Sequence, residues 1–248
     1  MIKVIGIIQA RLGSTRLPNK VMLNLNDKPV LWHIYNRLQK CDLLNEVIIS
    51  TGEYKNNKQI CDFANQNDIP LFMGSEKDLI DRLYKTALKY HATAIVRITG
   101  DCPLVDPKIV DNLIQKFKEG KNDIITNCEK RTFPHGLDVE VISIKTLKKL
   151  WDEIKELELR EWFPFFIQKN PTMFKILNVE NNDNYSKFRW TLDYPEDYEF
   201  LQEIYKNLFQ KEKIFYMNDV LNLLKKYPKL KEINSKYVDH HNIGAPKI

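Results

Sequence analysis

The segment MIKVIGIIQARLGSTRLPNK, residues 1–20, decides the fold. Its β-branched run Lys3–Gln9 predicts a buried strand, and a loop of small and basic residues follows directly. Downstream, amphipathic helical patterns alternate with short apolar runs, which is typical of βαβ units around a largely parallel sheet. The chain is therefore predicted to be an α/β protein with helices flanking a mainly parallel central sheet.

The remaining elements are predicted from hydrophobic spacing and from proline and glycine positions. Further strands are expected at Glu46–Thr51, Pro70–Phe72, Ala94–Ile98, Asp123–Thr126, Leu137–Ile142, Phe174–Leu177 and Phe188–Leu192. Helices are expected at Val30–Lys40, Asp78–Tyr90, Pro107 to about Gly120, Lys145–Lys155 and Leu159–Lys169, and two more begin near Pro195 and Asn218. Pro164 should kink or shorten the helix that contains it, and the last twenty residues are expected to form an irregular tail.

The composition excludes several classes of protein. With 43% hydrophobic and 29% charged residues the chain resembles ordinary soluble proteins, and no stretch reaches the roughly 20 apolar residues of a membrane span. The net charge of +5 is mild and the lysines are dispersed, so neither nucleic acid nor a membrane is an expected partner. Four scattered cysteines without zinc-ligand spacing indicate free thiols in a reducing cytoplasm. No linker or repeat divides the 248 residues, which predicts one domain.

Three cations lie among small residues in the loop ARLGSTRLPNK, Ala10–Lys20. The small residues let backbone N–H groups approach an anion, while Arg11, Arg16 and Lys20 can neutralise a triphosphate and the departing pyrophosphate. Ligands of open α/β sheets bind at the carboxyl ends of the strands, where this loop is expected. A phosphate-binding loop is therefore favoured over the alternative, a basic surface loop.

Two aspartates follow predicted strands, Asp101 in VRITGDCPLVDP and Asp193 in FRWTLDYPEDYEFL. Carboxylates at neighbouring strand ends would give a hard cation such as Mg2+ two anionic ligands and leave positions for phosphate oxygens and water. The alternative for an isolated aspartate is a turn or helix cap. Asp106 is assigned to a cap, and Asp197 to the first turn of a helix, where negative charge favours the helix dipole.

These three segments, in this order, resemble the cytidylyltransferase family that contains CMP-sialic acid and CMP-KDO synthetases, and most closely its SpsF-like branch, named for a spore coat polysaccharide protein. Three intermediate segments match as well: GSEKDLIDRL at Gly74–Leu83, TFPHGLDVEV at Thr132–Val141 and LELRE at Leu157–Glu161. The resemblance therefore covers nearly the whole chain.

The resemblance implies a Rossmann-like nucleotidyltransferase fold in a single domain, residues 1–248. Within it, 1–128 would be mainly the nucleotide-binding half, 129–190 the acceptor and dimerisation region with an arm, and 191–248 the metal-site strand end and C-terminal helices. The nucleotide-binding residues would be Ala10, Arg11, Leu12, Gly13, Ser14, Arg16, Lys20, Thr51, Arg82, Thr99, Gly100 and Asp101. The acceptor-binding residues would be His135, Asp138, Glu140, Arg160, Glu161 and Arg189.

By the same resemblance the enzyme would transfer CMP from CTP to a sugar acid or related anionic acceptor, release pyrophosphate and serve surface glycan biosynthesis as a homodimer. Arg11, Lys20, Asp101 and Asp193 would be catalytic, with Mg2+ held by the two aspartates. For a hydroxyl acceptor, Asp138 is the candidate general base.

One departure from the SpsF-like pattern lies at Trp162-Phe163-Pro164, where relatives usually have a His followed by Thr-Pro. Apolar rings in that place suggest an acceptor with a less polar face. Two other functions stay open from the residues. A glycosyltransferase that uses a sugar nucleotide would hold its metal on a DxD-like pair, which Asp138 and Glu140 imitate; a non-catalytic regulator would bind nucleotide without turnover.

Overall fold

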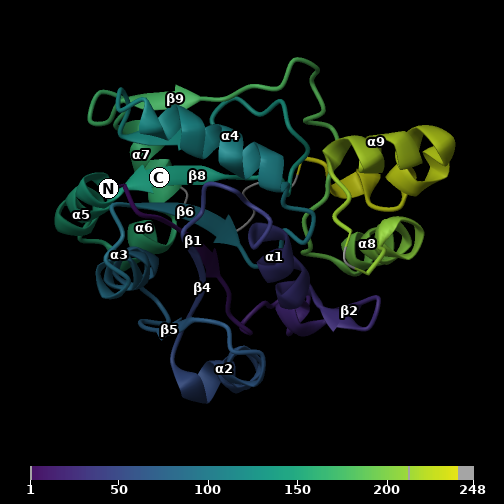
Figure 1. Ribbon diagram of the computed structural model, residues 1–248, viewed down its shortest axis with the longest axis horizontal. Coiled ribbons are helices and arrows are strands. Elements are labelled where there is room, and N and C mark those ends of the chain that lie inside the picture. Colours follow the sequence, from purple (N-terminus) through teal and green to yellow (C-terminus); the bar gives the residue numbers. More distant parts are fainter. Residues whose placement is uncertain (1, 212, 240–248) are drawn as a thin grey trace.

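Seven strands form one sheet, in the order β5-β4-β1-β6-β8-β7-β9 (Figure 1). The computed structural model describes residues 2–211 and 213–239. The strands of the sheet are β1 (Val4–Gln9), β4 (Glu46–Thr51), β5 (Leu71–Met73), β6 (Ala94–Thr99), β7 (Ile124–Thr126), β8 (Glu140–Ser143) and β9 (Ile176–Asn178). Among these described strands β8 alone runs against the others, pairing antiparallel with β6 and β7. The prediction of a mainly parallel central sheet is confirmed.

Alternating side chains along the strands build a hydrophobic core on each face of the sheet. In β1, Val4 and Ile8 belong to one core and Ile5 and Ile7 to the other, as the two-residue period of a strand requires. All four side chains are fully buried. Burying one Val or Ile side chain stabilises a fold by about 1.5–3 kcal/mol, so the central strands give a rigid frame for the loops at their ends.

Helices cover both faces of the sheet (Figure 1). The core that contains Val4 receives buried residues from α1 (Val30–Leu38), α2 (Tyr54–Gln66), α4 (Pro107–Lys118), α8 (Pro195–Leu208) and α9 (Met217–Lys226). The core that contains Ile5 receives them from α3 (Leu79–Lys89), α5 (Ile144–Glu153) and α7 (Phe163–Lys169). Shorter elements are α6 (Leu157–Glu161), the hairpin β2 (Asn24–Leu25) and β3 (Lys28–Pro29), and three 3-10 turns at Lys20–Met22, Pro228–Glu232 and Ser235–Tyr237.

The helix signals in the sequence have the expected structural counterparts. Asp106 caps α4 by accepting the Lys108 N–H at 2.9 Å, and Pro107 occupies the first turn. Just beyond the end of this helix, Gly120 has φ +73°, a left-handed conformation that glycine adopts without strain. Asp197 accepts the N–H of Tyr194 at 3.1 Å at the start of α8, so its assignment to the first turn is confirmed.

The prediction of a strand at Phe188–Leu192 is wrong. The segment is extended, but it forms only an isolated bridge, between Arg189 and His135. Its backbone instead serves two different loops: Trp190 donates to the His135 carbonyl at 2.6 Å, and Leu192 donates to the Asp101 carbonyl at 2.9 Å. An alternating apolar pattern shows which side chains are buried, but it does not show which groups accept the backbone N–H bonds.

Two predictions for the second half are changed in detail. The single helix Leu159–Lys169 is two helices, α6 and α7, because Trp162 between them has the non-helical angles φ −110° and ψ 38°, and Pro164 lies in the first turn of α7. The expected irregular tail contains two 3-10 turns in residues 228–237, and residues 240–248 lie outside the described part of the chain. Strands β8 and β9 begin three and two residues later than predicted.

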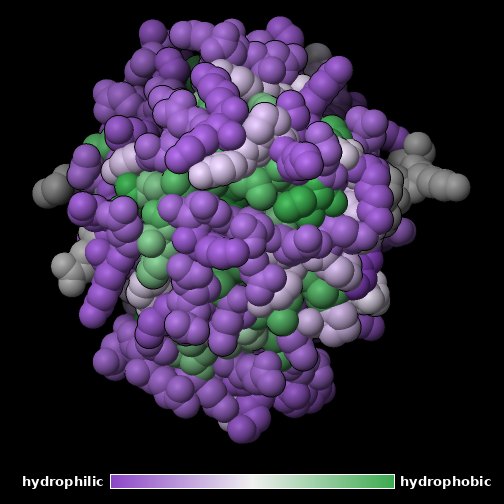
Figure 2. Space-filling view, turned by 90° about the vertical axis from the view of Figure 1, so that its right-hand side faces the viewer, coloured by the Kyte–Doolittle hydropathy of each residue, from purple (hydrophilic) through white to green (hydrophobic). Residues whose placement is uncertain are grey.

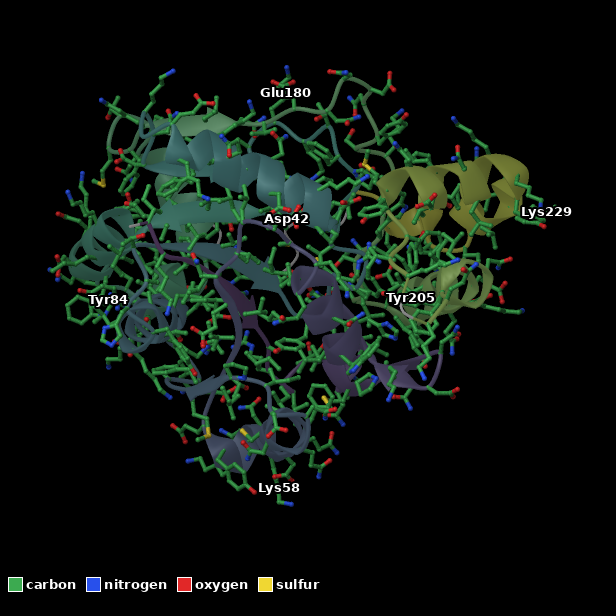
Figure 3. The ribbon with its side chains drawn as sticks, viewed as in Figure 1. Asp42, Lys58, Tyr84, Glu180, Tyr205 and Lys229 are labelled. Carbon is green, nitrogen blue, oxygen red and sulfur yellow. The ribbon has the colours of Figure 1, made fainter. Side chains whose placement is uncertain are left out.

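The surface is largely hydrophilic. On the face that carries α8 and α9, polar and charged side chains surround a band of apolar ones (Figure 2). Lys58 and Lys229 extend from the outer edges of the molecule, whereas Tyr205 lies on α8 (Figure 3) and donates its buried hydroxyl to the Pro103 carbonyl at 2.7 Å. Across residues 2–211 and 213–239, no helix combines the length and apolar character that a membrane crossing requires.

Candidate active site

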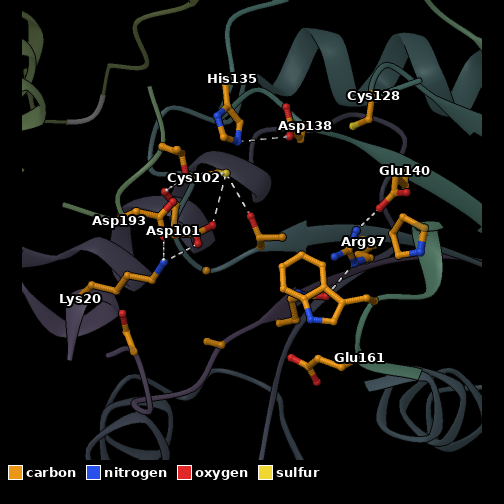
Figure 4. Close-up of a pocket in the computed structure, with 18 of the residues that line it drawn as sticks. Lys20, Arg97, Asp101, Cys102, Cys128, His135, Asp138, Glu140, Glu161 and Asp193 are labelled. Atoms are coloured by element: carbon orange, nitrogen blue, oxygen red, sulfur yellow. Dashed lines mark hydrogen bonds and ion pairs between the residues drawn. The ribbon is translucent and has the colours of Figure 1, made fainter. Parts of the chain in front are cut away.

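A cleft of about 960 Å3 opens where β1 and β6 end (Figure 4). One wall consists of the loop Ala10–Lys20 with Gly100–Asp101 and Asp193, and it is called the nucleotide side after the role that the sequence resemblance predicts for it. The opposite wall, called the acceptor side for the same reason, comes from the segments Glu129–Glu140 and Glu161–Gln168, with Arg97 of β6 between the two. The cleft thus lies at the carboxyl ends of parallel strands, where ligands of open α/β sheets bind.

The nucleotide-side loop is anchored at its start by backbone contacts. The Ala10 N–H donates to the Ser50 carbonyl at 3.1 Å, and the Leu12 N–H donates to Oδ1 of Asn57 at 3.0 Å. Gly100 packs so closely beneath the loop that an added Cβ would lie 3.0 Å from the Ala10 Cβ and 3.0 Å from the Gln9 carbonyl oxygen. The glycine therefore lets the end of β6 approach the loop and brings Asp101 to the cleft.

One ammonium group joins the two predicted metal ligands. Lys20 Nζ lies 2.6 Å from Oδ2 of Asp101 and 2.8 Å from Oδ1 of Asp193 (Figure 4). Arg16 Nη2 adds a second contact to the same Asp193 oxygen, at 2.8 Å. Burial by itself would raise the pKa of Asp193, but Lys20 and Arg16 outweigh it and hold this pKa well below its usual range. Burial would likewise lower the pKa of Lys20, yet Asp101 and Asp193 raise it, so the ammonium stays charged.

Asp193 reaches this position because its segment lies between two others. Leu192 is bonded to the Asp101 carbonyl through its backbone, and Thr191 Oγ1 donates to that carbonyl at 3.2 Å. On the other side Gly136 has φ +110°, and a Cβ there would lie 2.5 Å from the carbonyl carbon of Trp190. Only glycine allows such an approach, so Gly136 is required for the placement of Asp193.

The acceptor side is built from arginine–carboxylate pairs. Arg131 makes a bidentate pair with Asp138, and Arg97 pairs with Glu140 while donating to the Gln9 side chain at 2.7 Å. Burial would raise the pKa of Asp138, but Arg131 lowers it to about 2. Asp138 is therefore ionised near neutrality and too weakly basic to suit the general-base role expected from the sequence.

Two further carboxylates line the acceptor side and are not paired with Arg97 or Arg131. Glu129 lines the cleft, and burial together with the nearby Glu140 raises its pKa. Glu161 lines it too and pairs across the cleft with Arg11 of the nucleotide side, at 2.7 Å. The apolar part of this wall comes from Trp162 and Phe165, whose rings lie 6.1 Å apart in an edge-on arrangement. Oxygen acceptors thus outnumber cations on this wall.

Comparison with known proteins agrees with this geometry. A family model described as cytidylyltransferase matches residues 5–239. The chain belongs to the cytidylyltransferase family. It is an enzyme, a nucleotidyltransferase, and the resemblance and fold class predicted from its sequence are confirmed.

Three similar proteins are informative for this cytidylyltransferase. It is 35% identical to a cytidylyltransferase of known structure from Leptospira borgpetersenii, with a TM-score of 0.88 over 93% of this chain and 97% of that one. It is 27% identical to the spore coat polysaccharide biosynthesis protein SpsF of Bacillus subtilis, over 91% of this chain and 95% of that protein. It is 31% identical to the 3-deoxy-manno-octulosonate cytidylyltransferase of Lawsonia intracellularis, over 56% and 57% of the two chains.

Most site residues predicted for the cytidylyltransferase line the cleft. On the nucleotide side these are Ala10, Arg11, Gly13, Ser14, Arg16, Lys20, Thr99, Gly100, Asp101 and Asp193, and on the acceptor side His135, Asp138, Glu140 and Glu161. Leu12 and Thr51 do not line it; Leu12 contributes its N–H to the loop anchor, and Thr51 is fully buried. Arg82 is buried on α3 and donates to the Ser75 carbonyl at 2.6 Å.

Two predicted acceptor ligands lie outside the cleft, in structural ion pairs. The guanidinium of Arg160 binds Oδ2 of Asp78 at 2.7 Å and the carbonyls of Trp151 and Ile154. The side chain of Arg189 is fully buried and bound to carboxylates of its own segment. The expectation that either arginine binds the acceptor does not fit these contacts, because each guanidinium already has its anionic partner.

The cleft residues that sequence reasoning missed include three cations, Arg97, Arg131 and Lys187, and the polar residues Glu129 and Gln168. The sequence did contain a signal for Arg97, because it is a charged residue within the buried strand AIVRIT of β6. A buried charge needs an ionic or hydrogen-bonded partner, and a position near the carboxyl end of a parallel strand points into the ligand cleft.

Proposed function

We propose that this cytidylyltransferase transfers CMP from CTP to a small, hydroxyl-rich sugar acid or related anionic acceptor, releases pyrophosphate and depends on Mg2+. The observation that carries the proposal is the Lys20 ammonium between the carboxylates of Asp101 and Asp193, at the end of a loop with two further cations. A cationic atom already bridges the two oxygens there. The same place suits a metal ion next to the phosphorus that is attacked.

The nucleotide side supplies positive charge for a triphosphate. Arg11 and Arg16 lie on the cleft, with 41% and 36% of their side chains exposed, and each has one carboxylate partner in this structure. When phosphate oxygens enter, the remaining N–H groups of each guanidinium can bind them. These cations would neutralise the charge that grows on pyrophosphate as it leaves, which is the main way a protein accelerates phosphoryl transfer.

The residues fit a magnesium ion. Asp101 and Asp193 each place an oxygen within 2.8 Å of one cationic atom, and carboxylate oxygens are the ligands that Mg2+ prefers. Residues 2–211 and 213–239 hold no group of three or more histidine, cysteine or carboxylate side chains arranged for a metal, so phosphate and water would complete the shell. Bound Mg2+ would supply Lewis-acid polarisation of the α-phosphate. Lys20 would then be freed to bind a phosphate oxygen.

The acceptor side supports a substrate with one anionic group and several hydroxyls. Arg97 and Arg131 retain N–H groups for one carboxylate, while Glu129, Asp138 and Glu140 can accept hydrogen bonds from hydroxyls. The similar protein from Lawsonia intracellularis is named for a sugar acid, and SpsF for polysaccharide biosynthesis. We therefore place the activity in the synthesis of surface glycans. Asp138 and Glu140 pair with two separate arginines, whereas Asp101 and Asp193 share one cationic atom, so a DxD-type metal pair of a glycosyltransferase is disfavoured.

In the proposed reaction an acceptor oxygen forms a bond to the α-phosphorus while the bond from that phosphorus to the pyrophosphate oxygen breaks. Arg131 and Arg97 would orient the acceptor through its carboxylate, and Arg16 and Lys20 would hold the departing phosphates. Lys20 and Arg16 keep Asp193 ionised at neutral pH, so its cleft-facing oxygen stays negatively charged. The hydroxyl proton leaves to solvent.

We also propose that the enzyme is a cytoplasmic homodimer that pairs through α6. Leu157 of this helix is 57% exposed, and together with Trp162 it lines a second pocket that shares Arg11 and Glu161 with the cleft. Multi-angle light scattering of the wild type and of Leu157→Asp tests this. A dimer that the charge dissociates is expected, and a monomeric wild type would refute the pairing.

The function is tested by pyrophosphate release with each of the four NTPs, Mg2+ and a panel of sugar acids and neutral sugars. Release is expected with CTP and a sugar acid only, and it should disappear in Asp101→Asn. Asp152→Asn is the matched control, because Asp152 is an exposed carboxylate on α5 outside the cleft. No release with any NTP and acceptor, or equal release from Asp101→Asn, would contradict the proposal.

A further inference from the structure

Asp193 is held from two opposite sides. Its Oδ1 faces the cleft and contacts Lys20 and Arg16. Its Oδ2 accepts from Nη2 of Arg189 at 3.0 Å, and the Arg189 side chain is fully buried. This contact fixes the position of Oδ2 and so helps to set the plane of the Asp193 carboxylate. Arg189 therefore controls the direction in which the cleft-facing oxygen points.

Arg189 itself is shared between two carboxylates. Its Nε and Nη2 donate to Oδ1 and Oδ2 of Asp197, both at 2.9 Å, and the Asp197 side chain is also fully buried. A guanidinium has five N–H donors, so the one Arg189 side chain binds both carboxylates at once and sets their relative positions. If Asp197 could move, Arg189 would be free to pair more closely with Asp193 and draw it from the cleft.

The C-terminal segment Asn234–Asp239 fixes Asp197 and Arg189. Asn234, 2% exposed, donates its amide hydrogens to Oδ1 of Asp197 at 2.9 Å and to the backbone carbonyl of Arg189 at 2.9 Å. Nη1 of Arg189 donates to the Tyr237 carbonyl at 3.4 Å. Three contacts from a segment about forty residues further along the chain thus converge on the pair that orients Asp193.

The same segment also packs beside the cleft. The ring of Tyr237 stacks on Tyr194, next to Asp193, with ring centres 3.8 Å apart and planes at 4°. The Tyr237 hydroxyl donates to Glu196 at 3.1 Å. Val238 and Asp239, which follow directly, line the cleft. If this segment served only to cover the hydrophobic core, it would not need its polar contacts to Arg189 and Asp197, the residues that lie behind Asp193.

We propose that Asn234 and Tyr237 are positioning residues: through Asp197 and Arg189 they set the orientation of Asp193 toward the metal and nucleotide. The proposal rests on the proposed function of Asp193 as a magnesium ligand. Outer partners that orient metal-binding side chains typically contribute about 10–100-fold in metal affinity, and the lower end of this range is expected for residues that act through two further side chains.

The test measures metal binding directly. Water-proton relaxation of Mn2+ with a non-hydrolysable CTP analogue gives the dissociation constant of the metal–nucleotide complex for each variant. In Asn234→Ala this constant should rise about tenfold, with a matching rise in the Mg2+ concentration needed for half-maximal turnover and no change in the KM of the acceptor. Leu221→Ala is the control: Leu221 is an apolar side chain buried on α9, in the same region of the chain, and it forms none of the hydrogen bonds and ion pairs of the network, so its loss should lower thermal stability but not metal affinity.

A second pair of variants covers the case in which Asn234→Ala does not fold. Tyr237→Phe keeps the stack on Tyr194 and should bind metal as the wild type does, whereas Tyr237→Ala loses the stack and should weaken metal binding. Metal affinity in Asn234→Ala and Tyr237→Ala equal to that in Leu221→Ala would overturn the positioning role. A wild type that binds no metal–nucleotide complex would instead overturn the proposed function, so the two failures are distinguishable.

Discussion

The two walls of the cleft carry opposite balances of charge. The nucleotide side has three cations, Arg11, Arg16 and Lys20, against the two carboxylates of Asp101 and Asp193. The acceptor side has two arginines against four carboxylates, with Arg97, Arg131, Glu129, Asp138, Glu140 and Glu161. One wall is suited to a highly charged anion, and the other to a substrate with many hydroxyls and little negative charge of its own.

In the proposed reaction, this difference would allow one cleft to bind two anionic substrates on separate walls. A triphosphate placed against the acceptor side would meet four carboxylates, and like charges in a partly buried site repel strongly. A sugar acid placed against the nucleotide side would leave its hydroxyls opposite arginine and lysine donors, without acceptors. The charge pattern would thus orient the proposed reactants before any chemistry begins.

The largest effect is expected from the nucleotide side. Lys20→Met removes the cation that Asp101 and Asp193 share, so kcat/KM for CTP should fall about 10²–10³-fold. Lys28→Met is the control, since Lys28 is an exposed lysine in the adjacent hairpin, outside the cleft. Steady-state kinetics of pyrophosphate release measure both variants. Equal kinetics in the two would show that the ammonium has no part in the reaction.

A substitution at Gly136 should disrupt its close backbone contact with Trp190. Gly136→Ala puts a Cβ 2.5 Å from Trp190 at φ +110°, so the free energy of unfolding should fall by about 3 kcal/mol. Gly120→Ala separates the two causes, because Gly120 has φ +73° but open space around it, and it should cost only about 1 kcal/mol. Urea unfolding of both variants provides the comparison. Similar losses in the two would mean that the loop shifts to accept the methyl group.

The acceptor side is tested by Arg131→Met. Loss of one charge-assisted hydrogen bond to the acceptor, about 1.4 kcal/mol, should raise the KM of the acceptor about tenfold and leave that of CTP unchanged. The neighbouring Lys130 is exposed and pairs with Glu180 outside the cleft, so Lys130→Met should change neither constant. If the KM of CTP rises instead, the two walls have been assigned the wrong way round.

The smallest effect concerns acid stability. The pKa of Asp138 is about 2 in the folded protein against an ordinary 3.8, so its ion pair stabilises the fold above pH 4 and this stabilisation is lost as the pH falls toward 2. Between pH 5 and pH 3 the wild type should lose about 1 kcal/mol more stability than Asp138→Asn, which has no carboxyl group to protonate there. Guanidinium unfolding at the two pH values measures the difference. Equal losses of stability in the wild type and in Asp138→Asn would mean that the acid sensitivity comes from other groups.

The frame of the fold could be predicted from the sequence because its signals are local. The β-branched run that forms β1 and the Asp106–Pro107 start of α4 are complete within a few residues, and both lie where predicted. The loop of cations and the two aspartates were also recognisable, since their residue types are rare together after a strand. The family resemblance then placed most of the cleft.

What the sequence did not predict depends on contacts between distant segments. Arg160 and Arg189 carry the same charge as Arg97, but only the fold shows that the first pairs with Asp78, 82 residues away, while the last opens on the cleft. The segment Phe188–Leu192 has a strand's alternation, yet its backbone partners belong to two loops. The sequence pattern indicates which side chains are buried, whereas the partners of those side chains depend on how the fold brings distant segments together.

The backbone bond from Leu192 to Asp101 has a consequence for how the enzyme acquires its activity. The two segments that it joins are distant in sequence, with Thr191 and Asp101 90 residues apart. The entropy of closing so long a loop opposes this contact, and it equally opposes the pairing of β1 with β6, since Val4 and Ala94 are also 90 residues apart. During refolding, catalytic competence should therefore appear only after both long-range contacts have formed, and not before the sheet has its native secondary structure.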